Sequence, residues 1–347
     1  MKNKNLKSQV HLVGSIPLSS AEEVFKLIGK KLSGCCHRIP DGETGDRSNW
    51  IGWQSQVFAN QEALIRKKNK ERAYQLQPPY TFATGYGKKD LDFSDLGFAR
   101  EAILSFSKFN ELQQKGVLPE SAKFMVALPT PFAPVYSFIS YGDQAAVLPI
   151  YEAAILSELD QIIKFVPHEK LSIQWDVATE MSIFEGVYKI KIEKYWDFLI
   201  NLLVRLGDKT PSNVELGYHL CYGSMNNKHW KEPENLSLCV RVSNILVEKL
   251  SRACNFVHMP VPEDRSDEAY FCPLTDLNMN SDTEVFLGLI HDHQTDKENI
   301  KKIKTAQKFL LDFGIATECG LGRREKESIP NLFELHNKLS EHINELR

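Results

Sequence analysis

Residues 213–220 read NVELGYHL, and residues 221–224 continue as CYGS. The first eight residues form a short, mostly apolar run of the kind that makes a strand. His219 and Cys221 are two positions apart, so in an extended chain their side chains leave the same face. An imidazole and a thiolate on one face are a donor pair that suits Zn²⁺. The stretch therefore predicts a strand that ends in two metal-binding side chains.

The same arrangement, an apolar run followed by a segment of helical periodicity, recurs along the chain. It is typical of strand-helix units that build a parallel sheet. The runs are QVHLVGS (9–15), CHRIPDG (36–42), KFMVALP (123–129), SIQWDV (172–177), NVELGYHL (213–220), NFVHMPV (255–261), EVFLGLI (284–290) and GIATECG (314–320). Amphipathic segments lie at about 21–33, 50–66, 97–116, 145–166, 188–206, 235–252, 295–312 and 329–346.

Eight such units predict an α/β fold in the form of a closed (β/α)8 barrel, because eight parallel strands can close on themselves with every helix outside. An open doubly wound sheet is the alternative. A G-x-G-x-x-G sequence after the first strand would favour it, but the chain reads GSIPLSS over 14–20. A barrel of about 250 residues commonly carries insertions, so we expect the 347 residues to form a single domain, 1–347.

The interval between the second and third predicted strands, residues 43–122, is the longest of the chain. Within it, residues 67–96 contain clusters of proline, glycine and charge, and we expect this part to be an insertion or loop within the barrel. Loops of this length often cover a functional site, and a solvated excursion is the alternative.

Composition limits the partners and the location that we expect. Lys and Arg number 42 against 45 Asp and Glu, for a net charge of −3, so nothing favours nucleic acid or an anionic membrane as a partner. The sequence shows neither an apolar leader nor a run of about 18 apolar residues, which predicts a cytoplasmic protein without a membrane segment. Seven cysteines without framework spacing indicate reduced thiols.

Polar residues gather at the ends of the predicted strands. They are Ser15, Asp41 to Glu43, Asp176, His219, Cys221, His291 to His293, and Cys319. Active sites of barrels form at the C-terminal ends of the strands, so we expect these side chains to share one rim. Cys319 would complete a zinc site of three protein ligands and one open position, as in catalytic zinc sites. The alternative is a hydrogen-bonded histidine beside a buried cysteine.

Six of these segments resemble, in the same order, the catalytic domain of cobalamin-independent methionine synthase, a family of the barrel superfamily that includes uroporphyrinogen decarboxylase. HLVGSIPLS (11–19) is similar to the family's IGSFPQT, GETGDR (42–47) to GEPERND, and IQWDVATE (173–180) to IDEPALRE. HLCYGS (219–224) is similar to its zinc motif HMCYSNF, GLIHDH (288–293) to GVxDxHS, and TECGLGRR (317–324) to PDCGLKTR. The resemblance spans residues 9–325 and implies a zinc-dependent methyltransferase on a barrel fold.

The resemblance also implies roles for individual residues. The family's zinc ligands fall on His219, Cys221 and Cys319, and its acid/base histidine falls on His293. Its contacts to the amino-acid substrate fall on Ser15 for the carboxylate and on Glu43 and Asp176 for the ammonium group. Two carboxylates are a suitable receptor for a cation on chemical grounds as well. The alternative is that these acids neutralise Arg47 or Arg38.

The chain departs from the family at two places. The family's fourth zinc ligand is a glutamate, and Met259 falls at that position, with His258 beside it and Glu263 in the following loop. A thioether is a poor ligand for zinc, so we predict His258 as the fourth ligand, with Glu263 or water as alternatives. The family's folate-stacking tryptophan is missing from LPTPFAPVYSF (128–138), where Tyr136 is the nearest aromatic residue. Trp50 and Trp53 are expected to pack in the protein interior.

These features predict a zinc-dependent methyl or alkyl transferase that acts on a small thiol, such as a homocysteine-like amino acid. Zinc would activate the thiolate, and His293 would give a proton to the leaving group. The methyl donor, folate or corrinoid, stays open. Two alternatives keep the same barrel: a zinc-dependent hydrolase or lyase, or a binding protein without catalytic activity.

Overall fold

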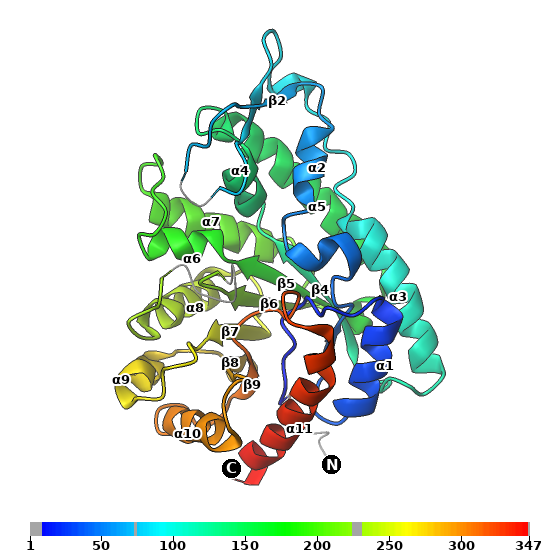
Figure 1. Cartoon of the computed structure of the whole chain (residues 1–347), viewed down its shortest axis with the longest axis vertical. Coiled ribbons are helices and arrows are strands. Elements are labelled where there is room, and N and C mark those ends of the chain that lie inside the picture. The colour runs from blue at the N-terminus through cyan, green and yellow to red at the C-terminus, as the bar shows by residue number, and fades with distance from the viewer. Residues whose placement is uncertain (1–8, 73–74, 224–230, 346–347) are drawn as a thin grey trace.

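The computed structural model describes residues 9–72, 75–223 and 231–345. Within these ranges seven strands form one sheet, in the order β1-β4-β5-β6-β7-β8-β9. They are β1 (Arg38–Pro40), β4 (Lys123–Pro129), β5 (Leu171–Val177), β6 (Glu215–Leu220), β7 (Phe256–Pro260), β8 (Glu284–Ile290) and β9 (Gly314–Thr317). Every neighbouring pair is parallel, so the C-terminal ends of all seven lie at one edge of the curled sheet (Figure 1).

Helices alternate with these strands and lie around the sheet (Figure 1), which confirms the predicted α/β class. Those that match predicted amphipathic segments are α1 (Ala21–Lys31), α2 (Gln54–Ala59), α3 (Phe98–Gln114), α5 (Gln144–Phe165), α7 (Tyr195–Asp208), α8 (Ser237–Lys249), α10 (Asp296–Ala306) and α11 (Ile329–Glu345). The shorter helices are α4 (Phe132–Phe138), α6 (Thr179–Phe184) and α9 (Glu268–Phe271). No helix in the described part of the chain combines the length and apolar character that crossing a bilayer requires.

The first predicted strand, residues 9–15, does not form a regular strand. Val10 makes isolated parallel bridges with both Cys36 and Ile315, and Ser15 makes one with Gly42. The segment therefore lies between the two edges of the sheet, near β1 on one side and β9 on the other. On the β1 side its backbone bonds are confined to the two ends of the segment, where the Gln9 and Val10 amides donate to the Cys35 carbonyl and the Ile16 amide donates to the Gly42 carbonyl, so the described residues make no continuous ladder there. The regular sheet of the described residues has seven strands where the sequence predicts eight.

The long interval between β1 and β4 contains regular structure of its own. It includes a short 3-10 helix η1 (Gly45–Asn49), α2, and an antiparallel pair made by β2 (Leu64–Arg66) and β3 (Tyr80–Phe82). The predicted loop over 67–96 thus contains β3 and the 3-10 helix η2 (Lys88–Asp90). Its backbone is tied to the end of α4, because the Ser140 amide donates to the Tyr80 carbonyl over 2.8 Å. The β2-β3 pair and α4 occupy the same end of the molecule in Figure 1.

A candidate metal centre in a cavity at the sheet edge

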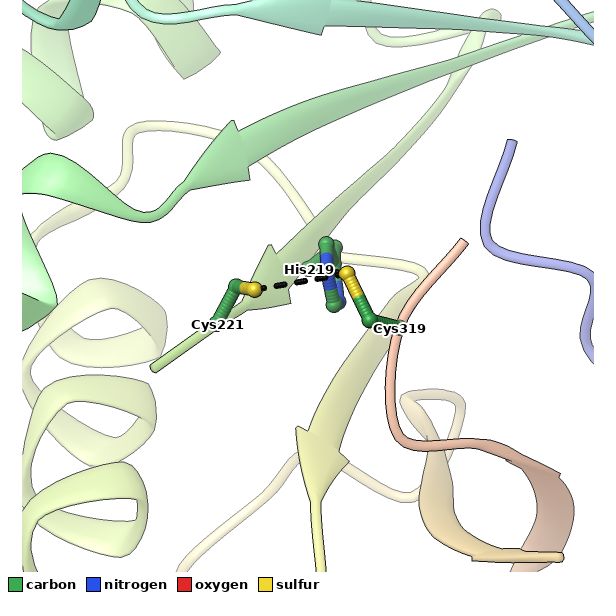
Figure 2. A group of neighbouring side chains, drawn as sticks. All are labelled: His219, Cys221 and Cys319. Carbon is green, nitrogen blue, oxygen red and sulfur yellow. Dashed lines mark hydrogen bonds between the residues drawn. The ribbon is translucent and has the colours of Figure 1, made fainter. Parts of the chain in front are cut away.

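Three possible metal ligands converge where β6 and β9 end. His219 lies in the last part of β6, Cys221 follows this strand, and Cys319 follows β9 by two residues. The two sulfur atoms are 3.5 Å apart, and the Cys319 sulfur is 3.8 Å from Nε2 of His219. All three ligand atoms lie within 4.8 Å of one another (Figure 2). The structure therefore brings together the three residues that the sequence singled out.

The dimensions of this cluster suit zinc. Zn–S bonds of about 2.3 Å and Zn–N bonds of about 2.0 Å in a tetrahedron place two sulfurs about 3.8 Å apart and a sulfur and a nitrogen about 3.5 Å apart. The separations in the cluster, 3.5 and 3.8 Å, are close to these values. The hydrogen bond with Cys319 and burial raise the pKa of the Cys221 thiol well above its usual value. A cation at the cluster would reverse this effect, since thiolate is the form that binds metal.

The predicted fourth ligand, His258, lies behind His219 and not beside the sulfurs. Its Nδ1 is 2.6 Å from Nδ1 of His219, and its Nε2 is 3.1 Å from the carbonyl oxygen of Thr317. Both ring nitrogens are therefore engaged, so His258 does not take the position of a ligand. Met259 is buried, whereas Glu263 is exposed in the loop after β7. Among the described residues, no fourth His, Cys, Asp or Glu joins the cluster within the same 4.8 Å limit.

The cluster lies in the wall of a cavity of about 430 Å³, a size that is ordinary for a small-molecule site. Ser15, Glu43 and Asp176 line the same cavity, as the sequence predicted for substrate contacts. Ser15 is held against the loop after Cys319: its carbonyl accepts from the Leu321 amide over 2.7 Å, and its hydroxyl accepts from the Gly322 amide over 3.2 Å. A Cβ at Gly320 would lie 2.4 Å from the Ser15 hydroxyl, so this approach requires a glycine.

Among the described residues, no ion pair joins Glu43 or Asp176 to Arg38 or Arg47, although the nearby charge of Arg47 partly offsets the rise that burial causes in the pKa of Glu43. Arg38 pairs with Glu215 and Glu284 at the other edge of the sheet, and Arg47 pairs with Asp41 over 2.9 Å. Burial, followed by the neighbouring charges of Asp176 and Asp41, raises the pKa of Glu43 well above its usual value.

Burial also raises the pKa of Asp176, to about 6. Desolvation thus disfavours the negative charge of both cavity acids, Glu43 and Asp176. A cationic group bound between them would offset this penalty, because opposite charges attract strongly where water is excluded.

Trp50 is a cavity residue that the sequence analysis assigned to interior packing. Its side chain lines the cavity, and its indole lies near enough to Asp176 to offset slightly the rise that burial causes in the pKa of that carboxyl. Its backbone has φ 47°, a left-handed conformation that non-glycine residues rarely adopt, and Glu43 in the same loop also has φ 47°. Trp53, in contrast, packs against Phe98 with ring centroids 4.8 Å apart, as expected. Trp50 follows the short helix η1, eight residues beyond the end of the predicted strand 36–42, so its distance from that strand end gave no signal of a site residue.

The structure does not bring His293 to the cluster. Its side chain is 78% exposed, lies 3.7 Å from a carboxylate oxygen of Asp292, and is not part of the cavity wall. Asp292 in turn pairs with Arg324. The proton-donor role of His293 stays a prediction. Arg323, Tyr136 and Tyr188 do line the cavity, and the two tyrosine rings stack with centroids 5.4 Å apart.

The fold and the cluster define an α/β protein with a candidate His-Cys-Cys metal centre at the C-terminal edge of its sheet. No model of a protein family matches the chain, and no curated protein matches its sequence. Solved structures do match. A B12-independent methionine synthase from Shewanella sp. W3-18-1, in complex with selenomethionine, has a TM-score of 0.54 at 14% identity. That match covers 97% of this chain and 98% of the other.

Two further structures match over almost their whole length. A methyltransferase from Methanosarcina mazei has a TM-score of 0.54 at 12% identity, and the match covers 96% of this chain and 94% of that one. A Listeria monocytogenes protein has a TM-score of 0.54 at 14% identity, with 96% and 97% covered. The chain therefore has the fold of the cobalamin-independent methionine synthase structures, as the sequence resemblance implied.

Proposed function

We propose that this protein is a zinc-dependent methyl or alkyl transferase whose acceptor is the thiol of a homocysteine-like amino acid. The observation that carries the proposal is the cavity itself. It is lined by two sulfurs and an imidazole together with two carboxylates, the buried Asp176 and the partly buried Glu43. A thiol, an ammonium group and a carboxylate of one amino acid would each find a complementary group there. The fold shared with methionine synthase and methyltransferase structures supports the same class of reaction.

The cavity residues would have separate roles in binding metal and substrate. His219, Cys221 and Cys319 would hold zinc, which when bound lowers the pKa of a thiol that reaches its open position. Glu43 and Asp176 would bind the ammonium group of the substrate, while Ser15 and the glycine-containing loop after Cys319 would bind its carboxylate. These contacts would hold the substrate sulfur in one orientation, which lowers the entropic part of the barrier.

The transfer itself needs no oxidant or reductant. A lone pair of the substrate thiolate forms the new S–C bond while the bond from the methyl group to its donor breaks. The electron pair of that bond stays on the donor, on nitrogen for a folate and on cobalt for a corrinoid. A nitrogen leaving group then takes up a proton.

The experiment measures metal and transfer in the same preparations. Purified protein is analysed for zinc and then incubated with homocysteine and either methyltetrahydrofolate or methylcobalamin, with methionine followed by mass spectrometry. We expect stoichiometric zinc and methionine formation with one of the donors, and we expect Cys221→Ser and Cys319→Ser to lose both. Cys272→Ser is the matched control, because Cys272 is an exposed free cysteine. A Cys319→Ser variant that keeps its zinc, or a wild type that binds none, would contradict the proposal and favour a binding protein.

A further inference from the structure

Two buried histidines face each other behind the candidate metal centre. His219 on β6 and His258 on β7 are paired in register across neighbouring parallel strands. Their side chains are 2% and 0% exposed, and their Nδ1 atoms are 2.6 Å apart. Such a contact between two ring nitrogens is attractive only when one nitrogen carries a proton and the other does not. The arrangement therefore constrains where the protons of both rings lie.

The contact of His258 with Thr317 determines which of the two Nδ1 atoms carries the proton. Its carbonyl oxygen lies 3.1 Å from Nε2 of His258 and can only accept, so this nitrogen must carry a proton. The hydrogen-bond partners of His258 are then a carbonyl and an imidazole, neither of which offsets the cost of burying a full positive charge. His258 is accordingly neutral, and its Nδ1 is the acceptor. Nδ1 of His219 is then the donor, which leaves the lone pair of His219 on Nε2.

This lone pair is the one that a metal at the cluster would use, because Nε2 of His219 is the atom 3.8 Å from the Cys319 sulfur. Thr317 also reaches the second ligand-bearing segment: its hydroxyl donates to the carbonyl of Cys319 over 2.7 Å. One residue at the end of β9 thus contacts both the imidazole pair and the loop that carries Cys319.

We infer that His258 is a positioning residue for the metal site: it accepts the Nδ1 proton of His219 and thereby holds His219 in the tautomer and orientation that present Nε2 to the metal. The inference rests on the proposed function, in that the site binds zinc. Outer partners of this kind fix the tautomer of metal-binding histidines, and their loss typically costs about 10- to 100-fold in metal affinity. It also accounts for His258 without making it the fourth ligand.

The test compares His258→Phe, which keeps an aromatic ring without an acceptor, with His258→Asn, whose amide oxygen can take the place of Nδ1. Zinc affinity is measured by competition with a chelator, and the first shell is counted by X-ray absorption at the zinc edge. We expect His258→Phe to bind zinc about 10- to 100-fold more weakly and His258→Asn to recover most of the loss. The shell should keep one nitrogen from protein and two sulfurs in both variants. His336→Phe is the control, since His336 is buried in α11 and bonds to the Leu332 carbonyl.

Three outcomes overturn the inference: wild-type affinity in His258→Phe, equal losses in the Phe and Asn variants, or a nitrogen missing from the shell of His258→Phe, which would make His258 a ligand. Nitrogen-15 NMR of the metal-free wild type provides a separate readout, with the Nδ1–H tautomer expected for His219. If the wild type binds no zinc, the proposed function fails, whereas this tautomer measurement still decides the role of His258. The same NMR measurement tests the role of His258 if the His258→Phe variant does not fold.

Discussion

At the scale of single residues, the two acids of the cavity determine which ligands it can hold. Glu43 and Asp176 lie in one wall, and burial disfavours the charge of each. The backbone passes close beneath, because a Cβ at Gly14 would be 3.0 Å from a carboxylate oxygen of Glu43. A neutral ligand would leave both acids with their desolvation penalty. An ammonium group would remove it, so the pair favours amino acids over simple thiols.

This preference predicts the effect of Glu43→Gln on two ligands that differ only in the ammonium group. We expect the variant to bind homocysteine at least about tenfold more weakly, as when one partner of a buried charged pair is removed. Its affinity for 4-mercaptobutanoate, which lacks the ammonium group, should stay near that of the wild type. Isothermal titration calorimetry on zinc-loaded protein measures both. An equal loss for the two ligands would show that Glu43 does not recognise the ammonium group.

Trp50 offers a direct signal of ligand binding. Its side chain lines the same cavity as Asp176 and affects the pKa of that acid, so an ammonium group that binds Asp176 would change the surroundings of the indole. We expect homocysteine to change the tryptophan fluorescence of the wild type and of Trp53→Phe, whereas Trp50→Phe should lose most of the change. Trp53 is the matched control, since it lies three residues away and packs on Phe98. The same response in both variants would mean that the ligand leaves Trp50 in place.

The sequence predicted some residues of the site and missed others for a physical reason. His219 and Cys319 lie near the C-terminal ends of predicted strands and Cys221 follows one directly, so the topology alone brings them together. Trp50 lies in a loop whose path depends on left-handed backbone at Gly42, Glu43 and Gly45, which periodicity does not reveal. His258 is correctly placed in a strand, but whether it binds metal or holds His219 depends on side-chain directions that only coordinates show.

At the scale of elements, apolar runs and helical periodicity located the seven strands of the main sheet and eight of the eleven described helices, because each of these elements buries one stripe or face. The β2-β3 pair and the helices α4, α6 and α9 were not predicted. The predicted strand at 123–129 coincides with β4, and the run at 284–290 coincides with β8. The run at 9–15, which is less apolar than these two, does not form a regular strand. It bonds to both edges of the sheet at isolated residues, and such pairing follows from the curvature of the whole sheet and not from local sequence.

The junction of β5 and α6 contains a buried acid that should make stability depend on pH. Glu180 is 0% exposed and accepts a hydrogen bond from the Thr130 hydroxyl over 2.5 Å. Its other carboxylate oxygen has no hydrogen-bond partner among the described residues. Burial raises its pKa from 4.5 to about 7. The folded state therefore keeps a proton that the unfolded chain has lost. Stability from this residue is complete below pH 4.5 and falls as the pH rises to about 7.

Glu180→Gln removes this titration while it keeps a similar shape. Over the window from pH 4.5 to about 7, we expect the wild type to lose on the order of 3 kcal/mol relative to the variant. Urea unfolding of both proteins at several pH values measures the difference. Parallel pH profiles for the two proteins would show that Glu180 ionises normally in the folded state.

At the scale of the whole molecule, one edge of the sheet carries the candidate site and the opposite edge carries ion pairs that connect the strands. The C-terminal edge carries the cavity and the candidate metal ligands. At the N-terminal edge, Arg38 begins β1 and pairs with Glu215 over 2.7 Å and with Glu284 over 2.6 Å, the first residues of β6 and β8. Burial alone would raise the pKa of Glu215, but the charge of Arg38 and its other partners lower it to about 2. One guanidinium thus links three strands that are far apart in sequence.

Removal of this cation should destabilise the fold and leave the metal site intact, because the two lie at opposite edges of the sheet. Arg38 is 5% exposed, and its partners Glu215 and Glu284 are 18% and 14% exposed, so Arg38→Met removes a buried cation from between two largely buried carboxylates. Glu215 keeps the more distant Lys123, whose ammonium is 3.7 Å away. Loss of one partner from such a group typically costs about 3–5 kcal/mol. We expect a fall of this size in the free energy of unfolding by urea, with an unchanged zinc content.

The matched control is Arg100→Met. The Arg100–Asp95 pair is exposed on both sides, so its loss should change the free energy of unfolding by less than about 1 kcal/mol. Equal unfolding midpoints for the two variants would mean that the ion pairs of Arg38 with Glu215 and Glu284 do not stabilise the fold. Packing of the apolar core would then have to hold these strands in place.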